Sequence, residues 1–580
     1  MQKAIVGIDF GTSGTGYAYS FIDDENKNIE LGKFKGQNTG IKVPTEIILD
    51  SKLQNVLSFG EKCSINNLKE GDLYFKNIKM NIYYKNKYIR AENYSNKSFL
   101  LIDIIAKILE YVKERALHSV RENRPNINED QIKWIVTVPS IWELEQKSLM
   151  ISACEKAGLF NQYTDRANFF ALEPEVASLY CLNDNSIDKN FLLPGKTYIV
   201  CDLGGGTGDI VTHFRTYDNK IQEKYQCTGG PYGSEEIEHK IFKDVIGKIF
   251  GYCDIHSLKE KFKRIQSGQD KKPEGFDITE KFINEQWEQI QKKIKDMKNI
   301  TEEQKDQAID INFQIFQDFE NGVSINDLVD KFNKSCPEGW NIKIISVKFW
   351  VLELPYKIIF DLIEEHGQKI SNKISEIYNK VKEVESILYV GGYCSNDVLI
   401  NYLKNKFPKL MPLKPSCPEK AVVIGAVLFG LNPYFIDIRK ATYTIGFNCD
   451  DIWDDKIHGG IGEKYFDHNF NIYKCKNSFH AFIRIGDDLS QSHDIEQSFI
   501  TMNSRTINLK FFKSSKRNPV LYNEDGVQLI GDVQLDLGKD FPVNERGFDL
   551  KLNFGGTFLV ASCKHPTSGR EIKLPIYFNN

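Results

Sequence analysis

The most informative segment of the sequence is YIVCDLGGGTGDIV, at residues 198–211. An apolar run ends at the carboxylate of Asp202, small residues follow at 204–207, and a second apolar run then begins. Backbone amides in such a glycine-rich turn can face phosphate oxygens at close range, because no Cβ atom stands in the way. The segment therefore predicts a β-hairpin that presents an aspartate and a phosphate-cradling turn to a ligand.

A second segment of the same design lies at residues 8–16, where IDFGTSGTG places Asp9 before a turn of small residues. A dinucleotide-binding loop is the competing interpretation, but its glycines should open a helix, and here the strand-like run YAYSF follows at 17–21. Mg²⁺ prefers carboxylates or their bound waters, and phosphate oxygens prefer several converging N–H donors. The two hairpins therefore predict two related lobes with a ligand between them.

The composition is that of an ordinary globular chain. Of 580 residues, 41% are hydrophobic and 27% are charged, and 75 basic and 79 acidic residues leave a net charge of −4. This balance gives no reason to expect nucleic acid or an anionic membrane as a partner. The 12 cysteines contain no C-x-x-C pair and the ten histidines show no metal-binding spacing, so neither a zinc cluster nor a disulfide framework is indicated. A cytoplasmic location is expected.

A third segment, LYVGGYCS at residues 388–395, is an apolar strand followed by Gly391 and Gly392, which would let the backbone approach a base or ribose. Together with four other motifs it resembles the motif set of the seventy-kilodalton heat-shock chaperones and their actin and sugar-kinase relatives. In chain order the motifs are GIDFGT at 7–12, EPEVA at 173–177, DLGGGT at 202–207, VGG at 390–392 and GA at 425–426. Five motifs in the family's order make the resemblance specific.

Within that family the chain looks most like the divergent twelfth subfamily. The segments that carry this finer resemblance are FKNIKM at 75–80, WIVTVPSIW at 134–142, GGPYG at 229–233 and GAVLFGLNP at 425–433. The resemblance covers nearly the whole chain, and residues 255–345 are its least matched part.

The resemblance implies an α/β fold, with a two-lobed actin-like ATPase domain of duplicated ribonuclease-H-like sheets and helices over residues 1–436. The charged, sparsely apolar stretch near 255–345 predicts a helical insertion in the second lobe. After Pro433, short alternating runs are separated by Gly, Asn, Asp and Pro turns, which is typical of an antiparallel β-sandwich. Residues 437–580 are therefore expected to form a sandwich that resembles a chaperone substrate-binding domain, without a helical lid.

The resemblance also implies a site for ATP or ADP with Mg²⁺. Asp9 and Asp202 would hold the metal, largely through water, and Glu173 would help to hold its water shell. Lys79 would occupy the family's catalytic lysine position, and Thr207 would help to place the attacking water. The implied catalytic set is Lys79, Glu173, Asp202 and Thr207. The implied nucleotide-binding set is Asp9, Gly11, Thr12, Ser13, Gly204, Gly205, Gly206, Gly229, Gly230, Glu288, Lys292, Gly391, Gly392 and Glu419.

Several positions depart from the family's pattern. After Glu288, the family's adenosine-side helix carries a Lys and an Arg one turn later, whereas this chain has Gln291 and Lys292. Ser395 stands where the chaperones usually have an arginine that stacks on adenine. The acidic-leucine linker that couples nucleotide state to peptide binding is not visible in NPYFIDI at residues 432–438. Base affinity and coupling to the C-terminal domain are therefore open.

The expected activity is slow hydrolysis of ATP to ADP and phosphate, with protein clients as the further expected partners. Two other classes stay open. A nucleotide-sensing scaffold would bind ATP with little turnover, which fits the altered adenosine side. A small-molecule kinase on the same fold would need a catalytic base and a polar substrate pocket beside the phosphates, and the sequence identifies neither.

Overall fold

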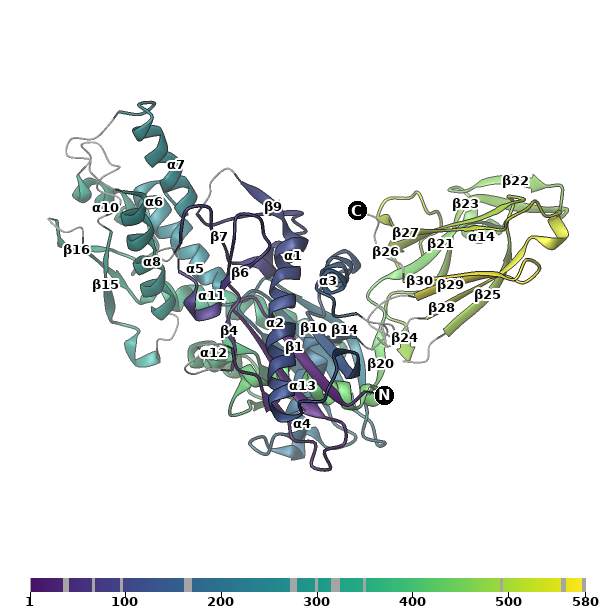
Figure 1. Cartoon of the computed structure of the whole chain (residues 1–580), viewed down its shortest axis with the longest axis horizontal. Helices are drawn as coiled ribbons and strands as arrows, with labels where there is room; N and C mark the ends of the chain where they lie inside the picture. Colours follow the sequence, from purple (N-terminus) through teal and green to yellow (C-terminus); the bar gives the residue numbers. More distant parts are fainter. Residues whose placement is uncertain are drawn as a thin grey trace.

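The computed structural model describes residues 2–34, 41–64, 68–93, 97–160, 169–271, 279–297, 301–313, 315, 324–347, 351–490, 494–553 and 560–575. Within this part the chain is a mixed α/β protein with several sheets (Figure 1). The strands β21–β23 and β25–β30 gather at one side of Figure 1, apart from the helix-rich remainder of the chain. None of the described helices combines the length and the apolar composition that crossing a membrane requires.

The first sheet contains the hairpin near the N-terminus. Strand β1 (Ala4–Phe10) pairs antiparallel with β2 (Gly14–Phe21), and Asp9 lies opposite Gly16. On its other side, β1 pairs parallel with β10 (Ile132–Val138), which pairs parallel with β11 (Phe170–Leu172). The long helix α2 (Leu101–Asn123) buries an apolar stripe in the same core. Asp9 is thereby placed at the end of a fully buried strand.

The second sheet repeats this order of strands. Its hairpin consists of β12 (Thr197–Leu203) and β13 (Gly208–Arg215), with Asp202 opposite Asp209. Strand β12 pairs parallel with β18 (Val384–Val390), which pairs parallel with β19 (Met411–Leu413). The order β11-β10-β1-β2 in the first sheet thus corresponds to β19-β18-β12-β13 in the second. Both hairpins predicted from the sequence are present, and the sheets that hold them are built alike.

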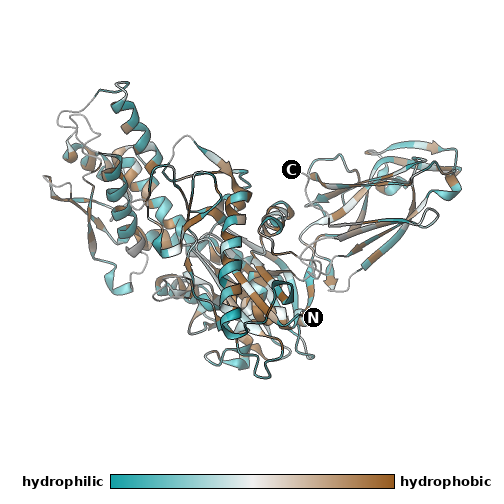
Figure 2. Ribbon diagram, in the orientation of Figure 1, coloured by the Kyte–Doolittle hydropathy of each residue, from teal (hydrophilic) through white to brown (hydrophobic). Residues whose placement is uncertain are grey.

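Two helices join the sheets. Helices α4 (Glu173–Asn183) and α13 (Ala421–Leu431) share a buried core with side chains of both sheets. They approach closely, because a Cβ atom added to Gly425 would overlap the carbonyl group of Val176. Hydrophobic residues, brown in Figure 2, are concentrated in these central strands and helices. This packing brings the first turn of α4 close to the ends of β1 and β12.

The second sheet is extended by a segment that links the two parts of the chain. Strand β14 (Ile221–Gly230) follows β13, and β20 (Ile436–Lys440) pairs parallel with β14. The far side of β20 pairs antiparallel with β24 (Asp488–Ser490). In the segment at 432–438, where no chaperone linker was visible, the 3-10 helix η10 (Pro433–Phe435) leads directly into β20 of the second sheet.

The stretch near 255–345 is mixed, whereas the sequence pattern predicted a helical insertion. Its described helices are α7 (Ile255–Gln266), α8 (Glu280–Met297) and α10 (Ile325–Asn333). It also contains strands β15 (Ala308–Asn312) and β16 (Lys343–Ser346), which both pair with β17 (Val351–Pro355). The strands are short and carry polar residues between their apolar ones, so their alternation is lost among the charged residues of the helices.

The C-terminal part is built from two antiparallel sheets with a common core. One sheet contains β22 (Glu463–Asp467), β23 (Ile472–Ile483), β21 (Thr444–Ile452), β26 (Thr506–Ser514) and β27 (Val527–Asp536). The other contains β25 (Asp494–Ile500), β28 (Gly547–Asn553), β29 (Val560–His565) and β30 (Arg570–Pro575). Buried side chains of both sheets, such as Phe511 and Leu550, belong to one hydrophobic cluster.

Candidate functional site

The turns of the two duplicated hairpins touch each other. A Cβ atom added to Gly205 would overlap the hydroxyl of Ser13, and one added to Gly206 would lie 2.6 Å from Oγ1 of Thr12. The first turn therefore leaves little room for a side chain at Gly205, and Met80 and Thr12 together leave little room at Gly206. The structure brings together Thr12, Ser13, Gly205 and Gly206, as expected from the sequence.

The second turn is fixed by backbone hydrogen bonds. The amide of Gly204 donates to the carbonyl of Thr207 at 2.9 Å, which closes the turn. The amide of Glu235, at the start of α5 (Glu235–Ile241), donates to the carbonyl of Gly205 at 2.8 Å. The Ser13 hydroxyl in turn donates to Oε1 of Glu235 at 2.5 Å. Glu235 thus links both turns, a role that no sequence motif indicated.

Three buried carboxylates lie at the strand ends behind these turns. Asp9, Asp202 and Glu173 are each less than 10% exposed. Burial raises the pKa of Asp202 well above its usual value, and the neighbouring charge of Glu173 adds to the effect. Among the described residues, Oδ2 of Asp202 has no hydrogen-bond partner. A buried carboxylate oxygen is unfavourable without a partner. A hydrated Mg²⁺ ion would supply one, because its bound waters donate hydrogen bonds to carboxylates.

Lys79 and Glu173 form a buried ion pair. Lys79 lies on the short helix α1 (Ile78–Tyr83), and its Nζ is 2.6 Å from Oε1 of Glu173 at the start of α4. Nζ also lies 5.6 Å from the centre of the Trp142 ring. Burial raises the pKa of Glu173, and the charge of Lys79 opposes that rise. The pair holds an ammonium group among the carboxylates of the site.

Lys42 is a second cation of the site that the sequence did not reveal. It precedes the two-residue strand β4 (Val43–Pro44), which pairs with β2 beside the first turn. Its ammonium makes an ion pair with Oδ2 of Asp9. Burial lowers the pKa of Lys42, but Asp9 and the other carboxylates more than offset this, so the net shift is upward. The group therefore stays charged beside Asp9.

The glycines expected near the nucleoside lie at two strand ends of the second sheet. Gly391 follows β18 with φ of 86°, and an added Cβ would lie 2.6 Å from Oδ1 of Asp202. Gly392 has open space at its Cβ position. Gly229 and Gly230 end β14 and lie opposite Asp209 and Gly208. Gly391 is therefore brought directly to the carboxylate of Asp202.

Glu419 belongs to the 3-10 helix η9 (Pro418–Lys420), where it is exposed. The carbonyl of Pro418 accepts a hydrogen bond from the amide of Gly391 at 3.2 Å. Glu419 therefore lies one residue from a direct contact with the Gly391 turn.

A cavity of about 500 Å³ opens beside the two turns. Its lining includes Thr12, Ser13 and Gly206 from the turns and Gln291 and Lys292 from α8. Among the residues that the structure describes, those lining the cavity do not include Gly229, Gly230, Gly391, Gly392 or Glu419. The structure thus brings Thr12, Ser13, Gly206 and Lys292 to one cavity, and its described lining leaves out the glycines at the end of β14 and after β18.

Helix α8 contacts the N-terminal part of the chain near this cavity. The hydroxyl of Ser64 donates to the carboxylate of Glu288 at 3.2 Å. Nζ of Lys76 donates to Oε1 of Gln291, also at 3.2 Å. Glu288 is therefore oriented by a contact between two parts of the chain that are distant in sequence.

The first turn of α4 connects the site to β20. Nε and Nη2 of Arg439 donate to the two carboxylate oxygens of Glu175 at 2.6 and 2.9 Å. Such a two-point guanidinium–carboxylate contact fixes geometry as well as charge. Because Glu175 lies two residues after Glu173, one helical turn contacts both the Lys79 ammonium and the strand that leads to the C-terminal part.

No protein-family model matches the chain. Curated heat-shock proteins are similar to it over nearly its whole length. Heat shock 70 kDa protein 12A of Mus musculus is 24% identical over 650 residues, which cover 99% of this chain and 91% of the relative. The human proteins 12A and 12B are 24% and 22% identical, with the same coverage. This similarity supports the placement of the chain in the twelfth subfamily of the heat-shock 70 kDa proteins.

Proposed function

We propose that the chain is an ATP-binding, heat-shock-like protein whose residues 1–436 form a two-lobed, actin-like ATPase domain. The contact between the turns at 11–13 and 204–207 is the observation that supports this most. The turns come from two sheets with the same strand order, and each turn follows a buried aspartate. Two related halves that meet at their phosphate-cradling turns would enclose the phosphates of a nucleotide.

Mg²⁺ is the metal that fits the residues of the proposed site. Asp9 and Asp202 would hold it, largely through water, and the unpartnered Oδ2 of Asp202 provides a ready acceptor for one of those waters. When bound, the ion neutralises charge on the phosphate oxygens. Because Lys42 is paired with Asp9, the ion and the ammonium would compete for the same carboxylate.

The proposed reaction is slow hydrolysis of ATP to ADP and phosphate. A water oxygen bonds to the γ-phosphorus while the bond from that phosphorus to the ADP oxygen breaks, and the protons of the water leave with the phosphate product. Thr207, at the end of the second turn, would place that water. Lys79, held by Glu173, would stabilise negative charge on the phosphoryl oxygens, and the amides of the turns would donate to them.

The nucleoside is proposed to lie on the side of the second sheet. Gly229, Gly230, Gly391 and Gly392 would let the backbone approach it, with Glu419 beside them. From α8, Glu288 and Lys292 would reach the same ligand. The contact of Glu288 with Ser64 would then tie nucleotide binding to the closure of the N-terminal and α8 regions over the cavity.

Residues 437–580 are proposed to form a β-sandwich that resembles a substrate-binding domain. The two antiparallel sheets with a common hydrophobic core support this assignment. A protein client would bind to this part. Nucleotide state would reach it through β20, which is held to the ATPase domain by Arg439 and Glu175.

A nucleotide-sensing scaffold with little turnover is the second candidate. It is favoured by α8, where Gln291 stands in place of the family's lysine and is bonded to Lys76. Such a protein would bind ATP and close without appreciable hydrolysis. Phosphate release at saturating ATP distinguishes this candidate from a slow ATPase.

The test is a comparison of nucleotide binding and phosphate release in Asp202→Asn and the wild type. The amide keeps the size of the side chain but removes a charge from the metal site, while the turn amides can still hold phosphates. Phosphate release should fall at least about tenfold, equivalent to about 1.4 kcal/mol in barrier height, with a much smaller change in ATP affinity. Asp218→Asn, in an exposed turn of the same sheet, is the matched control. Equal turnover in Asp202→Asn and the wild type would show that Asp202 does not serve the metal.

A further inference from the structure

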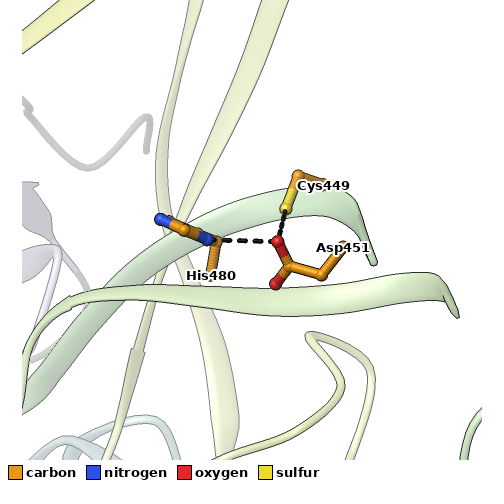
Figure 3. Close-up of side chains that lie close together, drawn as sticks. All are labelled: Cys449, Asp451 and His480. Atoms are coloured by element: carbon orange, nitrogen blue, oxygen red, sulfur yellow. Dashed lines mark hydrogen bonds and ion pairs between the residues drawn. The ribbon is translucent and has the colours of Figure 1, made fainter. Parts of the chain in front are cut away.

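Three metal-ligating side chains of different types meet on the C-terminal five-stranded sheet. Cys449 and Asp451 lie on β21, and His480 lies on the neighbouring antiparallel strand β23. Figure 3 shows the three side chains pointing toward one another. None of them has a role in the proposed nucleotide site.

The register of the two strands explains why the side chains meet. Residues two apart on a strand share a face of the sheet, which places Cys449 and Asp451 together. His480 pairs with Phe447, two residues before Cys449, so it reaches the cluster as a diagonal neighbour. The register also shifts between Cys449 and Asp451. Such an irregularity turns side chains out of their ordinary directions and often marks a functional site.

The distances between the ligand atoms suit one metal ion. Sγ of Cys449 lies 3.3 Å from Oδ1 of Asp451, and Nδ1 of His480 lies 3.2 Å from the same oxygen. The three ligand atoms all lie within 4.8 Å of one another. Around a tetrahedral zinc ion, with bonds of about 2.0–2.3 Å, ligand atoms are separated by roughly 3.3–3.8 Å. An ion can therefore enter the cluster with only small movements of the side chains.

Gln497 orients His480 as a metal ligand. Nε2 of His480 lies 2.9 Å from Oε1 of Gln497, on β25 of the other sheet. Because the amide oxygen of Gln497 can only accept, Nε2 is the donor in this bond, and Nδ1, which faces Asp451, is the nitrogen that can ligate an ion. Metal-binding histidines usually make such an outer hydrogen bond, which fixes both tautomer and ring orientation.

The surroundings of the histidine are apolar on one side and open on the other. The ring of His480 lies 5.7 Å from that of Phe447, 5.5 Å from that of Phe482 and 5.4 Å from that of Phe499, measured between centres. The side chains of His480 and Asp451 are nevertheless 28% and 35% exposed. The cluster thus has a rigid aromatic wall and access for an ion and for a water molecule as a further ligand.

We propose that Cys449, Asp451 and His480 bind a zinc-type divalent transition-metal ion, with water as the fourth ligand. A thiolate and an imidazole select such an ion over Mg²⁺ or Ca²⁺, which prefer oxygen ligands. The ion would cross-link β21 and β23, and through Gln497 it would also fix the position of β25. The site is independent of the proposed nucleotide site and adds to the C-terminal part a metal site with one open, water-occupied position.

The test is a titration of the full-length, metal-free chain with Co²⁺ in the presence of excess Mg²⁺. Mg²⁺ occupies oxygen-ligand sites, so a thiolate-to-cobalt charge-transfer band reports a cysteine-containing site. The expected result is one equivalent of Co²⁺ with this band, which Zn²⁺ then displaces. Absence of a stoichiometric band, or its persistence in Cys449→Ser, would overturn the proposal, because Co²⁺ would then be bound elsewhere.

Two further variants test whether Gln497 orients His480 and whether the band comes from another cysteine. Gln497→Ala leaves all three ligands in place and should weaken Co²⁺ binding about 10–100-fold while it preserves the band, because it removes only the orienting partner. Cys336→Ser, at a half-buried cysteine in the 255–345 stretch, should leave both the band and the affinity unchanged. An unchanged affinity in Gln497→Ala would contradict the assigned orientation of His480. Loss of the band in Cys336→Ser would place the cobalt site at that cysteine and overturn the proposal.

Discussion

The ammonium of Lys42 is paired with the carboxylate of Asp9, the residue proposed to hold Mg²⁺. The positive charge of Lys42 therefore neutralises Asp9 in the absence of a metal ion. An ammonium group and a metal ion that share one carboxylate compete for it. The strength of the ion pair between Lys42 and Asp9 therefore sets the Mg²⁺ concentration that the site requires.

Lys42→Met should lower the Mg²⁺ concentration needed for half-maximal ATP binding, because it removes the competing charge. The expected change is about tenfold, equivalent to about 1.4 kcal/mol. Fluorescence titration with a labelled ATP analogue at increasing Mg²⁺ measures it. Lys52→Met, at an exposed turn, should have no effect. A raised Mg²⁺ requirement in Lys42→Met would instead mean that Lys42 contacts the phosphates directly.

Gly233→Ala should displace the second phosphate turn. An added Cβ would overlap the carbonyl oxygen of Gly205 and the amide nitrogen of Gly206, and backbone atoms cannot turn aside as a side chain can. The substitution should reduce the free energy of unfolding by about 1–3 kcal/mol and weaken ATP binding. Gly547→Ala, whose added Cβ meets its nearest atom only at 4.0 Å, is the matched control. Equal denaturant midpoints for the two variants would contradict the close packing of the turn.

Asp209 provides a prediction on pH. Burial, with the nearby charge of Glu173, raises the pKa of Asp209 to about 7. Above pH ~4 the carboxyl of Asp209 keeps its proton in the folded chain and loses it in the unfolded chain. Its contribution to the free energy of unfolding is therefore full below pH ~4 and is lost as the pH rises through about 7. Asp209→Asn keeps the acceptor for the Ile141 amide. Between pH ~4 and 7, its free energy of unfolding should rise relative to that of the wild type by at most about 4 kcal/mol.

Chemical denaturation of the nucleotide-free chain at several pH values measures this difference. Asp525→Asn, at an exposed turn, should give a curve parallel to that of the wild type. A parallel curve for Asp209→Asn as well would show that the Asp209 carboxyl is ionised in the folded chain throughout this range.

Arg439→Lys should loosen β20 while it preserves the positive charge. Lysine cannot reproduce the two-point contact of the guanidinium with Glu175. Hydrogen exchange of the amides at 436–440 should accelerate by about tenfold or more, and any protection that ATP adds there should decrease. Arg505→Lys, at an exposed arginine of the C-terminal part, is the control. Unchanged exchange in Arg439→Lys would mean that strand pairing alone holds β20.

The hairpins could be predicted from the sequence because each is a local pattern. Apolar runs on both sides of a turn of small residues specify the strands, and the aspartate at the strand end follows directly. The expected strand-to-turn arrangement around Asp9 and Asp202 matches the structure for this reason. The short strands β15 and β16 were missed because their alternating residues are embedded in a charged, mostly helical stretch.

The residues that sequence reasoning missed are brought to their sites by contacts between segments that lie apart in the sequence. Lys42 reaches Asp9 only because β4 pairs with β2, and Glu235 reaches Ser13 only because α5 begins against the second turn. Cys449 and His480 meet through the register of β21 and β23, so the spacing of cysteines and histidines along the chain gives no sign of it. Such contacts depend on tertiary structure and have no local signal.

Calorimetric titration of the full-length chain with ATP in excess Mg²⁺ tests the proposed nucleotide site most directly. Saturable binding of one ATP per chain is expected, and it should weaken strongly when EDTA removes the metal. ATP at about 1,000 times its Kd should also raise the free energy of unfolding by about 4 kcal/mol. The absence of saturable heat at millimolar ATP, with and without Mg²⁺, would contradict the assignment of the paired hairpins as a nucleotide site.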